Sequence, residues 1–165
     1  MQKAIFLDRD GVINEERGTY THRWEDFRFV KGLFDSLRRF QENGYMLIVI
    51  TNQGGVAKGI YTEKDVESLH TKMLEVMENE KIHISDIDYC PHHQDYQICE
   101  CRKPKPLMLL RMMEKYNVDP KQSYFIGDSP RDIVAGEAAG IASIKIDPNS
   151  SLGEIEHLIA GLQQE

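Results

Sequence analysis

Two carboxylates separated by one residue follow the first apolar run of the chain. Residues 4–7 are all apolar, Asp8 and Asp10 come next, and Gly11 gives the chain freedom to turn. We expect residues 4–7 to form a buried strand with both carboxylates at its carboxyl end, which is where a parallel α/β sheet binds ligands. Because environment can push the pKa values of such a pair apart, one carboxylate can be an ionised nucleophile and metal ligand, and the other a general acid. The alternative is an ordinary strand end followed by an Asp-Gly turn.

A second cluster gathers all three cysteines of the chain within twelve positions. Cys90 and His92 are followed by Cys99 and Cys101, which gives the pattern Cys-x-His…Cys-x-Cys. Four such ligands suit a closed tetrahedral Zn²⁺, and because they leave no open position we predict a structural zinc rather than a catalytic one. His93 is the alternative ligand, but His92 is favoured because, like Cys101, it lies two residues from a partner cysteine. The competing interpretation is a loop of reduced thiols with incidental histidines.

Apolar strand-like runs alternate with segments of helical periodicity along the whole chain. We expect strands near residues 4–7, 45–50, 84–89, 123–126 and 142–146, and helices near 32–43, 62–80, 106–116, 131–139 and 152–162. This alternation predicts an α/β fold with a doubly wound parallel sheet.

Polar residues gather after three of the predicted strands. Thr51 and Asn52 follow the second strand, and Asp128 follows the fourth. Because ligands bind at the carboxyl ends of parallel strands, we expect these side chains to join Asp8 and Asp10 in one site.

Length and composition restrict the class of protein. The 165 residues suffice for one domain, placed over residues 1–165, and 41% hydrophobic and 28% charged residues are ordinary for a globular protein. No apolar run approaches the ~20 residues that cross a bilayer, and no signal-peptide pattern is seen, so we expect a cytoplasmic monomer without a membrane partner. A net charge of −7 argues against a nucleic-acid partner but allows a small anionic substrate beside a local cation. Three cysteines are an odd count, which suits a disulfide framework poorly.

Four short motifs, in order along the chain, resemble those of the haloacid-dehalogenase-like phosphatases. They are Asp8-Arg9-Asp10-Gly11, Thr51 at the end of the second predicted strand, Lys103, and Gly127-Asp128 with Asp132 four positions on. One departure is Val12, where the family more commonly has Thr. The resemblance spans nearly the whole chain. It implies a Rossmann-like three-layer α/β/α sandwich with a central parallel sheet, no cap domain and a zinc-binding loop.

The resemblance also implies a reaction. Asp8 attacks phosphorus to form an aspartyl-phosphate, while Asp10 protonates the leaving oxygen and then activates water. A Mg²⁺ held by the side chains of Asp8 and Asp128 and the backbone carbonyl of Asp10 overcomes the repulsion between the two anions.

Further residues are implied in holding the phosphoryl group. Thr51 and the adjacent Asn52 bind its oxygens, and Lys103 balances its negative charge. Asp132 either orients Lys103 or is an ordinary charge near a helix N-terminus.

The zinc loop narrows the resemblance to the heptose 1,7-bisphosphate 7-phosphatases and the histidinol-phosphate phosphatases, which share it. Residues 18–32 and 54–62 look more like the heptose enzymes, whereas the five residues between His93 and Cys99 are nearer the short loop of the histidinol enzymes. We therefore expect a Mg²⁺-dependent phosphomonoesterase for a small phosphorylated metabolite, with D-glycero-D-manno-heptose 1,7-bisphosphate first and histidinol phosphate second. A polynucleotide 3′-phosphatase, which shares the Asp-x-Asp-Gly and Thr-Asn-Gln signatures, and a non-catalytic binding module are further alternatives.

A bisphosphate needs a second cation beyond the Mg²⁺, and the predicted zinc loop offers one. Arg102 follows the zinc ligand Cys101 directly, and its planar fork can bind phosphate oxygens in pairs. Lys58 and Arg23 are the next candidates.

Overall fold

The central strand of the fold is built from the first apolar run of the sequence. β1 (Ala4–Leu7) lies in the middle of a five-stranded sheet in this computed structural model, which describes residues 1–162. All four of its side chains are fully buried, because successive residues point to opposite faces and both faces are covered. Ile5 and Leu7 pack into one core, and the other two residues pack into a second core.

The sheet is parallel throughout and has the order β3-β2-β1-β4-β5. Its other strands are β2 (Met46–Asn52), β3 (Ile84–Cys90), β4 (Tyr124–Gly127) and β5 (Ala142–Lys145). The chain moves outward from β1 to β3 and then returns to place β4 on the other side of β1. Open α/β sheets bind ligands at the carboxyl ends of the strands where the order reverses in this way.

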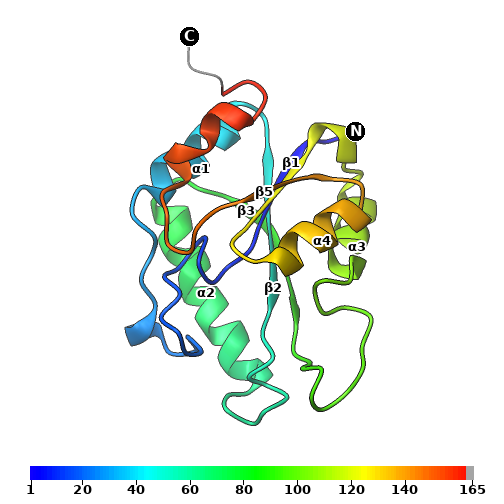
Figure 1. Cartoon of the computed structure of the whole chain (residues 1–165). Helices are drawn as coiled ribbons and strands as arrows, with labels where there is room; N and C mark the ends of the chain where they lie inside the picture. The colour runs from blue at the N-terminus through cyan, green and yellow to red at the C-terminus, as the bar shows by residue number, and fades with distance from the viewer. Residues whose placement is uncertain (163–165) are drawn as a thin grey trace.

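Helices cover both faces of the sheet (Figure 1). α1 (Leu33–Glu42) and α2 (Glu63–Asn79) pack into the core that contains Ile5 and Leu7. α3 (Leu107–Tyr116) and α4 (Pro130–Ala138) pack into the opposite core. The prediction of an α/β fold with a parallel sheet is therefore confirmed. No described helix is both long and apolar enough to cross a membrane.

The predicted helix over residues 152–162 is wrong. The described chain has 3-10 turns at η1 (Trp24–Asp26), η2 (Pro120–Gln122), η3 (Leu152–Glu154) and η4 (Glu156–Leu158). In the last segment the Ala160 N–H donates to Tyr124 Oη at 3.1 Å, and the Ala160 carbonyl accepts from Tyr45 Oη at 2.7 Å. The first of these hydrogen bonds engages an N–H that a continuous helix would pair internally, and both fix Ala160 against tyrosine side chains. Apolar spacing was therefore not a guide to helix formation in this segment, in which Leu158 is 50% exposed.

Helix α4 approaches β5 so closely that residue 136 has no room for a side chain. A Cβ placed on Gly136 would overlap Ser143 Oγ and would lie 3.1 Å from Ser143 Cβ and 3.3 Å from Phe125 Cδ1. Glycine in a helix interior normally destabilises by about 1 kcal/mol relative to alanine. At this position the close contact between helix and sheet requires it.

We expect Gly136→Ala to lower the free energy of unfolding by about 1–3 kcal/mol, the usual effect of overpacking, although alanine is the better helix former. Urea unfolding measures the change. The control is Glu137→Ala on the exposed side of the same helix, which should alter stability by no more than about 0.5 kcal/mol. A more stable Gly136→Ala protein would contradict the close packing.

Candidate active site

A buried lysine joins the carboxyl ends of the central strands. Lys103 is 3% exposed; its Nζ donates to Asp8 Oδ1 at 2.9 Å and to the Ile50 carbonyl at 3.0 Å, and lies 2.7 Å from Asp132 Oδ1. Burial opposes the ammonium charge, but the two carboxylates outweigh it and raise the pKa of Lys103. The lysine is therefore charged, and its three N–H groups have three acceptors. Asp132 orients Lys103 and is not an ordinary exposed helix charge, since it is 2% exposed.

Carboxylates outnumber cations around this lysine. Carboxylate oxygens of Asp8, Asp128 and Asp132 lie within 4.8 Å of one another. Burial, reinforced by the charges of Asp132 and Asp128, raises the pKa of Asp8 well above its usual range, and burial also raises the pKa of Asp128. One lysine cannot neutralise three carboxylates, so the cluster is short of positive charge. Hard oxygen donors with excess negative charge fit a Mg²⁺.

Gly11 makes this carboxylate cluster sterically possible. Its φ of 90° lies in the left-handed region, and a Cβ there would overlap the Asp128 carboxylate. The glycine expected only to turn the chain thus also admits the carboxylate from β4.

Asp10 is held by three hydrogen-bond donors. Its Oδ1 accepts from Arg9 Nη2 at 2.8 Å and from Asn14 Nδ2 at 2.9 Å, and its Oδ2 accepts from Gln53 Nε2 at 3.1 Å. Burial opposes ionisation, but the Arg9 charge and these hydrogen bonds outweigh it and lower the pKa of Asp10. The carboxylate is therefore ionised and fixed in orientation.

The pKa values of Asp8 and Asp10 are separated as the spacing predicted, but in the opposite sense. The predicted nucleophile, Asp8, has the raised pKa, and the predicted proton donor, Asp10, has the lowered one. Burial raises the pKa of Asp8 and the charges of Asp132 and Asp128 add to it, whereas the Arg9 guanidinium and three hydrogen bonds outweigh burial at Asp10. A cation bound beside Asp8 would lower the pKa of Asp8, and a phosphate dianion bound beside Asp10 would raise the pKa of Asp10. Binding of both would move the pair toward the predicted order.

Arg9 fixes the position of Asp10 from behind. Its side chain is 1% exposed, donates to the Thr21 carbonyl at 2.8 Å and lies 3.2 Å from His70 Nε2 on α2. Because arginine has only donors, His70 Nε2 must accept, which places the ring proton on Nδ1. Burial and the Arg9 charge lower the pKa of His70 to about 3. One side chain therefore ties β1, the loop containing Thr21 and α2 together.

Asn52 and Thr51 hold the site from β2. Asn52 Oδ1 accepts from the Lys103 N–H at 3.0 Å, and Asn52 Nδ2 donates to the Lys103 carbonyl at 3.1 Å. The side-chain amide of Asn52 is therefore hydrogen-bonded to both backbone groups of Lys103. Thr51 is fully buried, and its Oγ1 accepts from Gln53 Nε2 at 3.0 Å. Gln53 in turn accepts from Tyr61 Oη at 2.7 Å. The loop after β2 is thereby rigid where it faces Asp10.

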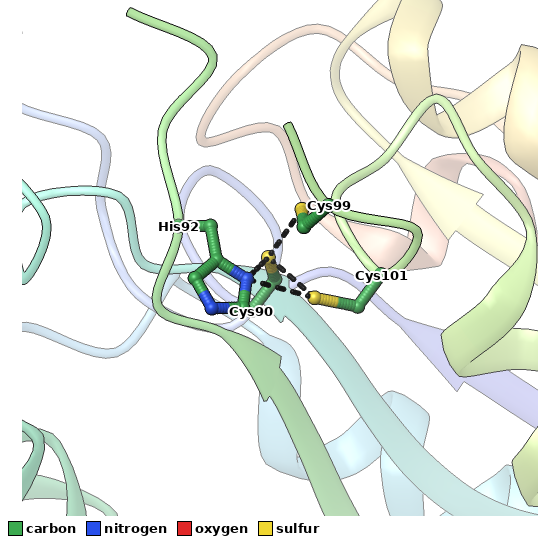
Figure 2. Close-up of side chains that lie close together, drawn as sticks. All are labelled: Cys90, His92, Cys99 and Cys101. Carbon is green, nitrogen blue, oxygen red and sulfur yellow. Dashed lines mark hydrogen bonds between the residues drawn. The ribbon is translucent and has the colours of Figure 1, made fainter. Parts of the chain in front are cut away.

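The predicted zinc ligands converge on one point (Figure 2). Cys90 Sγ lies 3.6 Å from Cys99 Sγ and 2.8 Å from Cys101 Sγ, and His92 Nδ1 lies 3.5 Å and 3.2 Å from the Cys90 and Cys101 sulfurs. Zn–S bonds of about 2.3 Å in a tetrahedron separate the ligands by about 3.8 Å, so this cluster is compact enough to share one ion. His93 lies outside it, and its Nδ1 accepts from the Asp95 N–H at 3.1 Å.

The electrostatics of the thiols also fit a cation. Burial raises the pKa of Cys90 and Cys101. Burial opposes ionisation of Cys99 as well, but hydrogen bonds from the Arg102 backbone and the neighbouring thiols outweigh it and lower its pKa to about 7. Three free thiols with this donor set suit Zn²⁺, which ionises its cysteine ligands.

The carboxylates and the loop that carries the Cys/His cluster face one cavity of about 730 Å³. Its lining includes Asp8, Asp10, Asp128, Asn52 and Lys103, and also Arg102 and Arg131. Arg102 Nη1 donates to the His92 carbonyl at 3.0 Å, and it lies over Gly54, where a Cβ would be only 2.9 Å away. Lys58 and Arg23, the next candidates for the second cation after Arg102, are not among the residues that line the cavity. Lys58 Nζ lies 5.4 Å from the centre of the Tyr20 ring.

Several residues of this site were not predicted from sequence, among them Arg9, Gln53, Arg131 and His70. Arg9 and Gln53 lie inside motifs that were recognised, so their positions offered a signal. Arg131 lies three residues after Asp128, in the first turn of α4. His70 is 61 positions from Arg9 and has the appearance of any other helix residue, so only the fold reveals it.

The comparisons with known proteins agree with this geometry. Residues 3–146 match the family model described as polynucleotide kinase 3 phosphatase. A D-glycero-beta-D-manno-heptose-1,7-bisphosphate 7-phosphatase of Pasteurella multocida is 40% identical over 146 residues, which cover 86% of this chain and 79% of the relative. A D-glycero-alpha-D-manno-heptose-1,7-bisphosphate 7-phosphatase of Campylobacter jejuni is 44% identical over 142 residues, with 86% and 80% covered.

A solved structure gives the same result for the fold. The D,D-heptose 1,7-bisphosphate phosphatase of B. bronchiseptica, complexed with magnesium and phosphate, has a TM-score of 0.84 and 29% identity. The match covers 98% of this chain and 88% of that one. Fold and site together define a phosphatase of the haloacid-dehalogenase-like superfamily. The chain belongs to the polynucleotide kinase 3 phosphatase family and, at about 40% identity, to the D-glycero-D-manno-heptose-1,7-bisphosphate 7-phosphatases.

The buried neutral His70 gives stability a defined pH dependence. Its pKa falls from 6.5 to about 3 on folding, so the unfolded chain binds more protons between these values. Stability from this group is therefore complete above pH 6.5 and is lost as the pH falls toward 3. Between pH 7 and pH 5 the loss is about 2 kcal/mol.

We expect His70→Gln, whose amide oxygen can still accept from Arg9, to lose about 2 kcal/mol less than the wild type over that interval. Urea unfolding at pH 5, 6 and 7 measures the difference. His157→Gln, at an exposed position, should keep the wild-type dependence. Parallel curves for wild type and His70→Gln would show that His70 is not a buried neutral acceptor.

Proposed function

We propose that this phosphatase removes the 7-phosphate of D-glycero-D-manno-heptose 1,7-bisphosphate. The observation that carries the proposal is the pairing of Asp8 with buried Lys103 beside Asp128 and a separately held Asp10, in one cavity. Relatives at about 40% identity are named for this activity. The net charge of −7 disfavours a polyanion such as a nucleic acid as the substrate. A small phosphorylated metabolite is therefore favoured over a polymer.

In the proposed first step, a carboxylate oxygen of Asp8 attacks phosphorus. The bond between phosphorus and the sugar oxygen breaks, and Asp10 gives its proton to that oxygen, so that the sugar leaves as an alcohol. In the second step Asp10 accepts a proton from water, and this water attacks the aspartyl-phosphate. Inorganic phosphate leaves, Asp8 is restored as a carboxylate, and Asp10 is again protonated.

The side chains of Asp8 and Asp128, with the backbone carbonyl of Asp10, would hold the Mg²⁺. When bound, this ion neutralises negative charge where the phosphate and the carboxylates meet. Lys103 supplies a fixed positive charge to the same region, and Asp132 keeps it aimed at Asp8. Asn52 lines the cavity and holds the Lys103 backbone, whereas Thr51 is fully buried, is not among the lining residues and accepts a hydrogen bond from Gln53.

The Cys90, His92, Cys99 and Cys101 cluster would hold a structural Zn²⁺. Its four protein ligands leave no position for substrate. Arg102 and Lys103 follow the last ligand directly, so the ion would fix the part of the loop that delivers both cations to the cavity. The free thiols fit a reducing compartment, and we place the protein in the cytoplasm.

The test is a panel of phosphate esters with purified protein and Mg²⁺. We expect kcat/KM for the heptose 1,7-bisphosphate to exceed that for histidinol phosphate and for a 3′-phosphorylated oligonucleotide by at least about 10²-fold. Asp8→Asn should reduce the rate by at least about 10³-fold, because an amide is a poor nucleophile. Asp35→Asn, an exposed change on α1, should retain activity. A preference for histidinol phosphate or for the oligonucleotide would overturn the assignment.

A zinc measurement tests the loop. Protein purified without chelator should contain about one zinc per chain, and Cys99→Ser should lose it while the sheet stays folded. We expect kcat/KM of Cys99→Ser to fall by about 10²-fold, because Arg102 and Lys103 are misplaced. Glu100→Gln, between two ligands but exposed, is the control that should keep both zinc and activity. Absence of zinc from the wild type would refute a structural zinc site.

A further inference from the structure

Two arginines from different parts of the chain line the cavity. Arg102 comes from the loop that follows Cys101, and Arg131 lies in the first turn of α4, three residues after Asp128. Arg102 is partly buried and anchored to the His92 carbonyl, whereas Arg131 is exposed. One is a fixed cation and the other is free to move toward a ligand.

Neither arginine is neutralised by the protein. Within residues 1–162, no Asp or Glu forms an ion pair with either guanidinium. By contrast, the other cation that lines the cavity, Lys103, has two carboxylate partners. An unpaired pair of like charges in one cavity leaves a region that attracts an anion.

The two arginines share the lining of the cavity with the carboxylates that surround Lys103. The carboxylate cluster and the arginine pair thus give one cavity two chemically different parts.

We propose that Arg131 joins Arg102 in binding the second phosphate of the bisphosphate, the one that is not hydrolysed, and so selects bisphosphates over monophosphates. The inference rests on the proposed function, which supplies the second anion. A phosphate dianion between two guanidiniums removes their mutual repulsion and accepts paired N–H bonds from each planar fork. Arg23 and Lys58, the next candidates after Arg102 in the sequence, do not line the cavity, whereas Arg131 does.

The consequence for kinetics follows from where the contact lies. The reacting phosphate is bound by other groups, so loss of Arg131 should weaken only the interaction with the remote phosphate. Hydrogen bonds to charged groups contribute roughly 1.5–3 kcal/mol, which corresponds to about a 10- to 100-fold change. The measured quantity is the selectivity, defined as kcat/KM for the heptose 1,7-bisphosphate divided by kcat/KM for the heptose 7-phosphate.

The experiment compares wild type, Arg131→Gln, Arg131→Lys and Arg28→Gln on both substrates. We expect Arg131→Gln to lower the selectivity by about 10- to 100-fold, mainly through KM for the bisphosphate. Arg131→Lys should recover part of it, since the charge remains but the planar fork is lost. Arg28→Gln is the matched control: an exposed arginine outside the cavity lining, whose removal should leave the selectivity unchanged.

A second measurement removes turnover from the comparison. In the Asp8→Asn background, calorimetry gives the affinity for each substrate directly, and Arg131→Gln should weaken binding of the bisphosphate more than that of the 7-phosphate. An unchanged selectivity, or an equal loss for both substrates, would overturn the proposal while leaving the proposed function intact. A wild type that does not hydrolyse the bisphosphate would overturn the proposed function and this inference together, before any variant is made.

Discussion

The buried ammonium of Lys103 is the interaction on which the site depends. It lies between Asp8, at the end of β1, and Asp132, in the first turn of α4, and a third proton goes to the backbone of β2. Removing one partner of a buried ion pair leaves an uncompensated charge, which destabilises by about 3–5 kcal/mol. Asp132 also accepts from the Ser129 N–H at 3.2 Å, so one carboxylate both begins α4 and holds the lysine. The contacts of Lys103 therefore position the end of β1, the end of β2, the start of α4 and the loop that carries Lys103 relative to one another.

The same arrangement explains why one cavity can serve opposite charges. Around Lys103 the protein supplies more carboxylates than cations, which is a binding environment for a metal ion. At Arg102 and Arg131 the guanidiniums have no carboxylate partners among the described residues. A ligand with a metal-bound phosphate at one end and a second phosphate at the other complements both regions. Net charge alone, at −7, gives no hint of this separation.

Much of this could be predicted from sequence because the signals were local. The apolar run before Asp8 defines a buried strand, and the alternation of strands and helices defines which ends meet. The zinc cluster was visible for the same reason, since its ligands lie within twelve positions. What failed depended on tertiary contacts: Ala160 bonds to two tyrosines instead of continuing a helix, and His70 reaches Arg9 across 61 positions. The pKa order of Asp8 and Asp10 depends on neighbours that no local pattern contains.

The loop between His93 and Cys99 has a role in how such an enzyme can change. Residues 94–98 are exposed, and Ile98 has 88% of its surface accessible. On either side, the metal-ligand cluster and the Asn52 grip on Lys103 anchor the chain to the sheet. Insertions or deletions within this short span would therefore be absorbed locally, without moving Lys103 or Arg102. Residues 94–98 can thus change in length or sequence, whereas Lys103 and Arg102 must keep their positions at the cavity.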